Sequence, residues 1–456
     1  MKYSKRDILN ILTFDNLIDI NYYYSSVKLN VLNRNIKPKI LRSNVCYSIL
    51  LFFILWLRKI TIIKSYKKTH KLVPIMLHSF TKNQRDAINN LTAIRKDTVI
   101  LGDSKFGDYM LPEFKAFFYA LPFFLDVWKK YKLSKGYVRK SFENIFYDYW
   151  LTHGYLIMLM DYLKKQKIKL VIVSNDHSMR TRVPILACKS VDIKSLYLQH
   201  ASVGVKFPRL TYDFALLEGQ DSLDKYRAIG KIDSIVFLIG SLKMGSKTAI
   251  NTNTKIDVIG LCFGLNDNLK IVENVIVELL KLFSPESIIL RAHPRENRTD
   301  FLNQMKNKFD IKTSNSKGQH VLDFLTGVDA IVCGESNIHL EATFMNITSI
   351  YCVLSDDNRE GYDVYGFIKN KLIQYICKTP EDLLSLVTEL SIDKPEVRHL
   401  AKYYDATVGS KYDGKASLLY DQVVSFIIDR KFEFINENFN CNIVKGVTVY
   451  TLKNTV

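Results

Sequence analysis

The segment LRAHPRENR, at residues 290–298, places two arginines and a histidine directly after an apolar run. Guanidinium and imidazole groups donate strong hydrogen bonds to phosphate oxygens, so Arg291, His293 and Arg295 could hold an anion. An arginine near the end of a strand is also commonly solvated or ion-paired, and a proline after a histidine can simply end the strand. One such cluster therefore does not define a site.

Two further segments of the same half also carry residues that could bind an anion directly after an apolar run. GLCFGLNDN contains Gly264 and Asn266, and a glycine lets the backbone approach a ligand closely. VCGESNIHLEA contains Gly334, Ser336 and Asn337 where a helix should begin, and exposed amides at a helix start can bind an anion. The same serine and asparagine would also be ordinary helix caps. The prediction of a nucleotide site rests on the convergence of all three segments.

One residue inside this expected helix could complete a nucleotide site. Glu341 follows Asn337 by four residues, so the two side chains should lie on the same helix face. A carboxylate placed there could accept hydrogen bonds from both hydroxyl groups of a ribose. It could also be a first-turn acid that is favoured by the helix dipole.

The first half offers fewer polar residues after apolar runs. VIVSNDHSMRTR contains Asp176 and His177, and LYLQHASVG contains His200. A transfer reaction needs a base that takes the proton of the attacking hydroxyl, and aspartate or histidine can serve near neutral pH. We favour Asp176 as this base, with His177 and His200 as its neighbours. The alternatives are a helix cap for Asp176 and a buried structural imidazole for His200.

The elements that must position these residues alternate along the chain. Six apolar runs between residues 71 and 241 each end in small or polar residues, and helical stretches separate several of them. Residues 242–255 are polar without periodicity and are the best linker candidate. A second alternating series follows the linker. Strands that are apolar throughout and joined by helices indicate parallel sheets covered on both faces.

This pattern predicts an α/β protein with two Rossmann-like domains that face each other across a cleft, preceded by a basic helical extension. Ligands bind such sheets at the carboxyl ends of the strands, where the candidate residues lie. The expected parts are a basic segment, a first Rossmann-like domain, a second Rossmann-like domain, and a C-terminal helix with a tail, at residues 1–70, 71–245, 255–415 and 416–456.

The beginning of the sequence is unusually basic. The first 71 residues contain fourteen Lys and Arg and three Asp, which gives +11 of the net charge of +18. Residues 45–57, VCYSILLFFILWL, form an apolar run of thirteen residues, which is shorter than the roughly 20 residues of a membrane span. A buried helix and an interfacial anchor on an anionic membrane both remain open. With no signal-peptide pattern, we expect a cytoplasmic protein peripherally associated with the inner membrane.

The cysteine pattern and the absence of known nucleic-acid-binding motifs limit which metals and partners we expect. Seven cysteines lie without CxxC spacing, which indicates a reduced compartment and neither a disulfide framework nor a zinc site. No helix-turn-helix, RRM or zinc-finger pattern appears, so we expect no nucleic-acid partner in spite of the charge.

The combination of these motifs resembles a known fold family. An HP segment, followed about forty residues later by an ES turn and a helix with an acid inside, resembles the C-terminal half of GT-B glycosyltransferases. The resemblance is closest to bacterial transferases of capsule and lipopolysaccharide, including Kdo-, sialyl- and glycerophosphate-transferring groups. The segments HSFTKNQRDAINNL, LYLQHASVG, LIGS and YDGKASLLYDQVVSFI add to it.

The resemblance implies roles and a reaction. It implies that His293 contacts the donor phosphate, that Ser336 and Asn337 bind its oxygens, and that Glu341 holds the ribose. The implied activity is metal-independent, inverting transfer of a sugar from a nucleotide donor, CMP- or UDP-linked, to a growing surface polysaccharide or a lipid-linked acceptor. It requires no cofactor beyond the nucleotide-sugar.

Two alternatives remain open. HPRENRTDF and GESNIHLEA also resemble UDP-N-acetylglucosamine 2-epimerases, although Pro294 stands at the first arginine of their HRREN motif and LQHASVG stands where they carry VEAG. A glycerophosphotransferase that uses CDP-glycerol is the other alternative.

Overall fold

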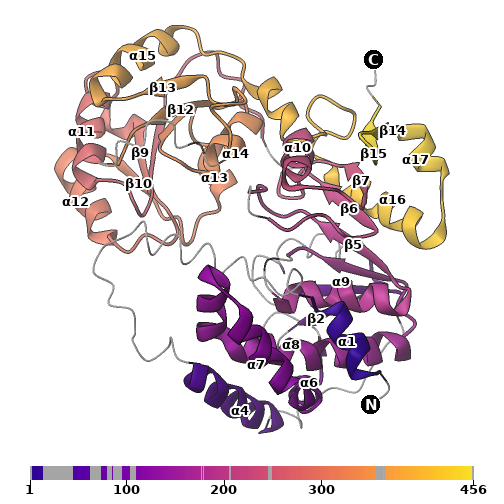
Figure 1. Ribbon diagram of the computed structural model, residues 1–456. Helices are drawn as coiled ribbons and strands as arrows, with labels where there is room; N and C mark the ends of the chain where they lie inside the picture. The colour runs from indigo at the N-terminus through magenta and orange to yellow at the C-terminus, as the bar shows by residue number, and fades with distance from the viewer. Residues whose placement is uncertain are drawn as a thin grey trace.

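Two α/β domains, each built on a mostly parallel sheet, make up the part of the chain described by the computed structural model (Figure 1). Predicted apolar runs supply strands in both sheets. The described residues are 3–13, 45–61, 73–79, 85, 95–102, 109–175, 177, 179–204, 207–244, 249–355, 363 and 365–453.

The first sheet follows the order β14-β15-β7-β6-β5-β4-β1-β2-β3 in the described residues. Strands β1 to β7 pair in parallel, and each of the six predicted runs contains one of them. These strands span Ile75–Ser79, Thr98–Gly102, Tyr109–Met110, Leu170–Val173, Lys194–Leu198, Phe214–Leu217 and Ile235–Leu238.

Most of the helices of this domain lie at the bottom of Figure 1, and α10 lies above β6. The helical stretch expected over residues 109–131 is divided, because Pro122 lies in a short 3-10 turn between α6 and α7. The helices are α1 (Lys5–Ile11), α4 (Val45–Thr61), α6 (Glu113–Ala120), α7 (Phe124–Leu133), α8 (Gly136–Lys165), α9 (Met179–Val191) and α10 (Gln220–Ile229).

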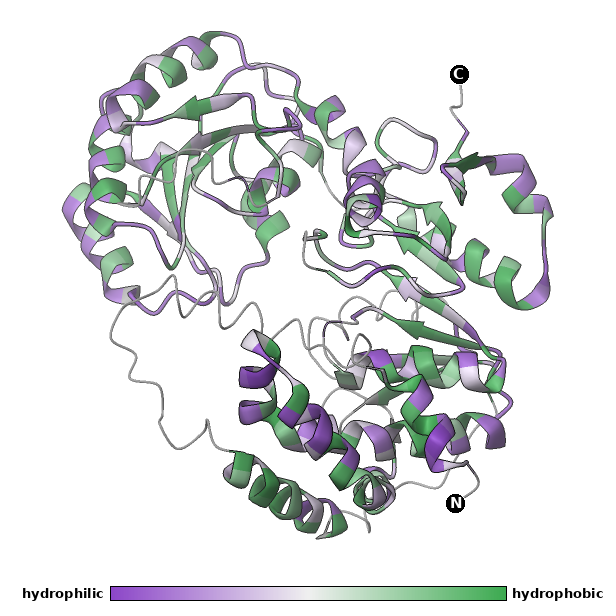
Figure 2. Ribbon diagram, in the orientation of Figure 1, coloured by the Kyte–Doolittle hydropathy of each residue, from purple (hydrophilic) through white to green (hydrophobic). Residues whose placement is uncertain are grey.

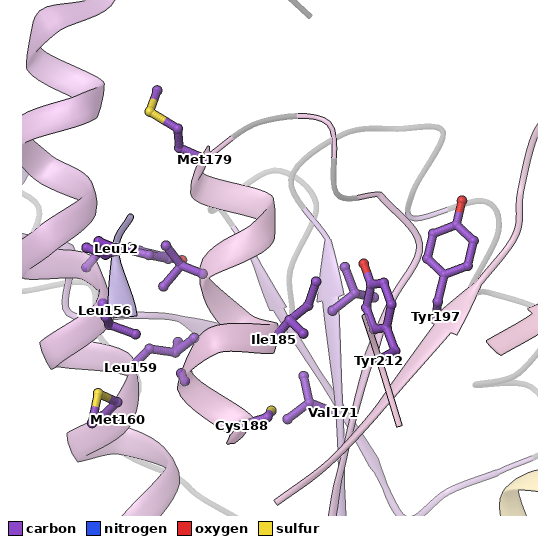
Figure 3. Packing of buried hydrophobic residues seen from close by; sticks show 14 of the residues in the cluster. Leu12, Leu156, Leu159, Met160, Val171, Met179, Ile185, Cys188, Tyr197 and Tyr212 are labelled. Atoms are coloured by element: carbon purple, nitrogen blue, oxygen red, sulfur yellow. The ribbon is translucent and has the colours of Figure 1, made fainter. Parts of the chain in front are cut away.

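The core of the first domain lies between α8, α9 and the sheet (Figure 3). Leu156 and Leu159 of α8 point towards α9. Ile185 and Cys188 of α9 point on towards Val171 of β4. Burial of these apolar side chains supplies most of the free energy that holds the layers together.

A glycine sets the distance between α6 and α8. A Cβ atom at Gly154 would lie 1.8 Å from the carbonyl oxygen of Ala116, so the two helix backbones are in direct contact there. One turn away, the indole of Trp150 donates to the carbonyl of Ala120 at 2.7 Å. The helical layer that carries α4 and α6 is therefore fixed rigidly to the domain.

The second sheet is parallel throughout its described strands, in the order β10-β9-β8-β11-β12-β13. Its elements match the second predicted series. They are β8 (Ile259–Phe263), α11 (Leu269–Leu279), β9 (Ile288–Ala292), α12 (Thr299–Phe309), β10 (Lys312–Ser314), α13 (Val321–Leu325), β11 (Ala330–Cys333), α14 (Ile338–Phe344), β12 (Thr348–Cys352), β13 (Tyr375–Cys377) and α15 (Pro380–Ile392).

The end of the chain returns to the first domain. The predicted helix is present as α16 (Ala416–Asp429), beside β7 in Figure 1. Beyond it, where only a tail was expected, α17 (Glu433–Asn438) leads into a hairpin of β14 (Phe439–Val444) and β15 (Val447–Leu452). Strand β15 pairs with β7, so the last residues extend the first sheet.

Candidate functional site

Three strand ends of the second domain meet at one edge. Strands β9, β8 and β11 are adjacent and parallel, so the segments that begin at His293, Gly264 and Gly334 all leave the same edge of the sheet. The backbone amide of His293 donates to the carbonyl of Phe263 at 2.8 Å, which ties two of these segments together. The convergence predicted from sequence is therefore observed.

His293 has a defined tautomer. Its side chain is exposed, and Nδ1 accepts a hydrogen bond from the backbone amide of Arg295 at 3.1 Å. An imidazole that accepts at Nδ1 carries its proton on Nε2 when neutral. Partial burial and the nearby Arg295 lower the pKa of His293, which favours this neutral form. His293 can therefore offer one N–H to an anion at this edge.

The segment after β8 is braced by Arg298. Its guanidinium donates to the backbone carbonyls of Gly264 and Asp267, both at 2.9 Å, and to the carboxylate of Glu296. The hydrogen bonds from Arg298 lower the pKa of Glu296 to about 2. Asp267 in turn accepts from the amide of Gly264 at 2.6 Å. These bonds leave Asn266 exposed at the tip of the segment.

Arg291 has partners within the protein. Its buried guanidinium donates to the hydroxyl of Ser314 and to the carbonyl of Gln319, and it lies 4.9 Å over the ring of Phe324. These contacts brace Arg291 within the protein, and its predicted contact with phosphate stays a prediction. Arg295 is exposed beside His293.

The turn after β11 is held by a buried histidine that the sequence did not single out. His339 bonds through Nε2 to the carbonyl of Gly334 at 2.8 Å and through Nδ1 to the hydroxyl of Ser349. The Ser336 hydroxyl accepts weakly from the amide of Ile338 at 3.4 Å. Because α14 has seven residues, its dipole adds little, and side chains must supply most of the attraction for an anion.

The glycines of this edge do not require close packing. A Cβ atom at Gly264 or Gly334 would meet its nearest neighbours at 3.6 Å and 3.5 Å, which is ordinary contact. Gly260, in contrast, lies inside β8, where a Cβ atom would come within 2.7 Å of the ring of Phe324. Packing within the protein therefore requires a glycine at Gly260 but not at Gly264 or Gly334.

The first domain has a corresponding edge. Strands β7, β6, β5 and β4 are adjacent and parallel. The residues after them include Lys243, Glu218, His200 and His177. Two of these four, the histidines, were predicted as site residues. Asp176, the favoured base, lies outside the described residues, so its role stays a prediction.

His200 is a neutral imidazole with one nitrogen available. Burial and the nearby Lys243 lower its pKa to about 4, while a hydrogen bond to the backbone of Ser174 raises it slightly. Among the described residues, the buried Nδ1 of His200 has no hydrogen-bond partner. The lone pair of Nδ1 is left to accept a proton.

His177 lies close to His200. Burial lowers its pKa to about 4, and the neighbouring charges of His200 and Arg182 act in the same direction. Its ring packs edge-on against Phe207 at 4.2 Å. The amide of His177 donates to Asn175 at 2.9 Å, which fixes the turn after β4.

Glu218 and Lys243 are site residues that the sequence reasoning missed. The buried carboxylate of Glu218 accepts from Gln199 at 3.1 Å and from Ser241 at 3.0 Å, and burial raises its pKa. Lys243 is exposed, and its charge acts on both His200 and Glu218. The signal for Glu218 was present, because it is an acid placed directly after the apolar run of β6.

The two edges touch each other. The hydroxyl of Ser202, two residues after His200, donates to the side-chain oxygen of Asn337 at 3.0 Å. Burial raises the pKa of Glu341 to about 7, Lys243 and Arg291 oppose this rise, and Glu218 adds to it. The charges of Lys243 and Glu218 on the first domain thus act on Glu341 of the second.

Further contacts fix the two domains to each other near this place. Lys225 donates to the carbonyl of Tyr365 at 2.7 Å, and the hydroxyl of Tyr403 donates to Asp224 at 2.9 Å. The amide of Ser241 donates to the buried Asp405 at 2.9 Å. The described residues contain no group of three or more His, Cys, Asp or Glu placed to hold a metal ion.

Comparison with known proteins identifies the architecture. No family model matches the chain, and no curated protein matches it in sequence. A protein from Listeria monocytogenes assigned as a UDP-N-acetylglucosamine 2-epimerase superimposes with a TM-score of 0.50 at 11% identity, over 79% of this chain and 98% of that one. At this identity the likeness shows the fold alone.

Two other solved structures are similar at lower scores. The UDP-N-acetylglucosamine 2-epimerase of Neisseria meningitidis, bound to UDP-GlcNAc, has a TM-score of 0.48 at 13% identity and covers 77% of this chain and 99% of that one. The wall teichoic acid polymerase TagF has a TM-score of 0.40 at 12% identity, with 84% and 99% covered. The chain has the GT-B fold of two Rossmann-like domains.

Proposed function

We propose that this protein is a glycosyltransferase that moves a sugar from a nucleotide-activated donor to a growing cell-surface polysaccharide or a lipid-linked acceptor. The second domain binds the nucleotide, and the first domain binds the acceptor. One observation carries the proposal, namely the hydrogen bond from Ser202 to Asn337, which joins the His200 segment to the candidate phosphate segments.

The groups at this contact suit an in-line displacement. The acceptor hydroxyl loses its proton to a base on the first domain, for which Nδ1 of His200 and the carboxylate of Asp176 are the candidates. The leaving phosphate gains negative charge, and the N–H of His293 and the ammonium of Lys243 stabilise it. A bound phosphate near His200 raises the low pKa of its imidazole, because an anion favours the protonated form.

Each donor-side residue has a distinct proposed task. The side chains of Ser336 and Asn337 and the backbone at Gly264 and Gly334 line the phosphates. Glu341 accepts from the ribose hydroxyls, and Asn266 lies where the nucleotide enters. Hydrogen bonds to Ser314 and Gln319 hold the guanidinium of Arg291 in place, so its positive charge is fixed on the donor side.

A thermal-shift screen with CMP, CDP, UDP and GDP tests the nucleotide half of the proposal. A ligand that binds only the folded protein raises its melting temperature. We expect one of these nucleotides to give a clear rise, and transfer assays with the corresponding sugar donors follow from it. A flat response to all four nucleotides would overturn the proposal.

An epimerase is the second candidate, and the two buried carboxyl groups favour it. Inversion at C2 of a sugar requires removal and return of a proton, and carboxyl groups with raised pKa values, such as Glu341 and Glu218, suit that exchange. Incubation with UDP-N-acetylglucosamine in D2O separates the two reactions. Deuterium at C2 without an acceptor identifies an epimerase, and unlabelled donor contradicts epimerisation of this substrate.

The acceptor and its location are part of the same proposal. A lipid-linked acceptor places the enzyme at the inner face of the membrane, as the basic N-terminal segment suggests. Among the described residues, no helix combines the length and apolar character needed to cross a bilayer. Selective response to CDP, followed by transfer of glycerophosphate, would instead identify the CDP-glycerol alternative.

A further inference from the structure

Helix α4 has one face fixed to the first domain. Phe52 is buried and stacks on Trp150 of α8 with ring centroids 3.8 Å apart. The hydroxyl of Ser48, also buried, accepts from the amide of Tyr147 at 3.0 Å. At the other end of the helix, Lys59 forms an ion pair with Glu113 of α6. These contacts set the orientation of α4 on the domain.

The opposite face of α4 is apolar and exposed. Five large apolar side chains at helical spacing lie on it, so they form one stripe along the helix. They are Leu50, Phe53, Ile54, Leu57 and Ile60, with exposed fractions of 55%, 41%, 49%, 65% and 42%. Figure 2 shows α4 as an almost continuous apolar helix at the outer edge of the first domain.

We propose that this exposed face of α4 docks on an anionic lipid bilayer. The helix has 17 residues and is about 25 Å long, and it lies on the domain, so it rests in the interface with its apolar side in the acyl region. Docking does not depend on the transfer reaction, and it goes beyond it by naming the surface that meets the membrane.

The positive charge of the N-terminal segment favours an anionic lipid surface as the partner of α4. The first 71 residues carry +11, and Arg58 lies in the last turn of α4 itself, next to Lys59, whose ammonium is paired with Glu113. Each basic residue near an anionic surface adds about 1 kcal/mol of attraction, and apolar burial adds to it. A neutral protein surface would not attract these positive charges in the same way. Docking through α4 also holds the domain with His200 and His177 at the bilayer, where a lipid-linked acceptor would be.

Vesicle co-sedimentation of the full chain tests this surface. Vesicles of phosphatidylcholine alone are compared with vesicles that contain about one-third phosphatidylglycerol. The variant Leu50→Glu/Ile54→Glu/Leu57→Glu changes three exposed positions of the stripe. The control Val277→Glu/Leu282→Glu/Ile392→Glu adds the same charge at three exposed apolar positions of the second domain.

We expect the wild type and the control to bind anionic vesicles, with binding weakened by salt, and the α4 variant to bind on the order of 100-fold more weakly. Equal binding by variant and control, or no binding by the wild type, overturns the proposal. A melting temperature lowered only in the α4 variant would mean that the protein itself covers this face. A change from dimer to monomer would mean that a second copy does so, and either result overturns the proposal as well.

The same samples separate this inference from the proposed function. A nucleotide-induced rise in melting temperature should be identical in the wild type, the variant and the control, because none of the six positions lies among the candidate site residues. Vesicle binding without any nucleotide response contradicts the transferase alone. A nucleotide response without vesicle binding contradicts the docking face alone.

Discussion

The two sheet edges that meet at the candidate site are built differently. In the second domain, Arg298, His339 and Asp267 hold the strand-end segments in place through backbone hydrogen bonds. In the first domain, His200 is half-buried and Glu218 is buried, and burial shifts both pKa values against the charged form. The first arrangement prepares a surface for an anion before it arrives. The second keeps a proton acceptor neutral until a ligand changes its surroundings.

The largest test of this contrast is His200→Ala. Loss of a general base lowers the transfer rate by about 10²–10⁴-fold, whereas the braced second domain still binds nucleotide. We therefore expect kcat to fall by about 10³-fold and the nucleotide-induced rise in melting temperature to persist. Loss of both the transfer activity and the nucleotide-induced rise in melting temperature would show that His200 is a structural imidazole.

Asp176→Ala completes this test of the first domain. If Asp176 is the base, its variant should abolish transfer and His200→Ala should retain part of it, with nucleotide binding intact in both. An Asp176→Ala protein that is simply unfolded would instead support the helix-cap interpretation, which circular dichroism can distinguish.

The sequence predicted the strands better than the site. The buried strands of both sheets are apolar throughout, and such runs stand out because parallel strands are covered on both faces. The C-terminal hairpin was missed because β14 is largely exposed and lacks that pattern. A signal was available in its turn, where Lys445 and Gly446 both have positive φ, as a type I′ hairpin turn requires.

The site was only partly predictable for a physical reason. Topology places strand ends at one edge, so the segments with His293, Gly264 and Ser336 could be brought together from the alternation of elements. Whether an arginine faces a ligand or a neighbouring carbonyl depends on tertiary packing, so the hydrogen bond from Arg291 to the carbonyl of Gln319 could not be predicted from the sequence. Lys243 was interpreted as part of a linker. The groups on which its charge acts come from distant segments of the chain, so the local sequence carried no sign of them.

His293→Ala tests the braced edge, and a smaller effect is expected than at His200. Loss of one donor to a developing negative charge lowers the rate by about 10²-fold, and it weakens nucleotide binding because the ground-state phosphate loses the same contact. Measured kcat and Kd should both change. His399→Ala, at an exposed imidazole, is the matched control and should change neither. Normal turnover in His293→Ala would remove this residue from the site.

Glu341→Gln should show that the ionised carboxylate at this position lowers the free energy of unfolding. Burial raises the pKa of Glu341 to about 7, above its usual value of about 4.3. The folded state therefore binds more protons than the unfolded state between these values, so this group lowers the free energy of unfolding as pH rises through that range. Well above pH 7 the cost is complete and on the order of 4 kcal/mol.

The matched comparison is urea unfolding of both proteins at about pH 4 and about pH 8. Glutamine keeps the shape and cannot ionise, so the variant should be more stable than the wild type at the higher pH and equal to it at the lower. If Glu341 also holds the ribose, the stabilised variant should bind nucleotide more weakly. Unchanged affinity would leave Glu341 without a role in binding.

The smallest expected effect comes from the contact between the edges. Ser202→Ala removes the hydrogen bond to Asn337, worth about 1 kcal/mol, and should lower kcat a few-fold while leaving nucleotide affinity unchanged. Asn337→Ala removes the same bond and, if the side chain also binds phosphate, weakens the nucleotide as well. The double variant separates these roles, because residues that act only through each other give less than additive losses. Fully additive losses in transfer would mean that Ser202 and Asn337 act independently, and the joining of the two edges would then make no contribution to the reaction.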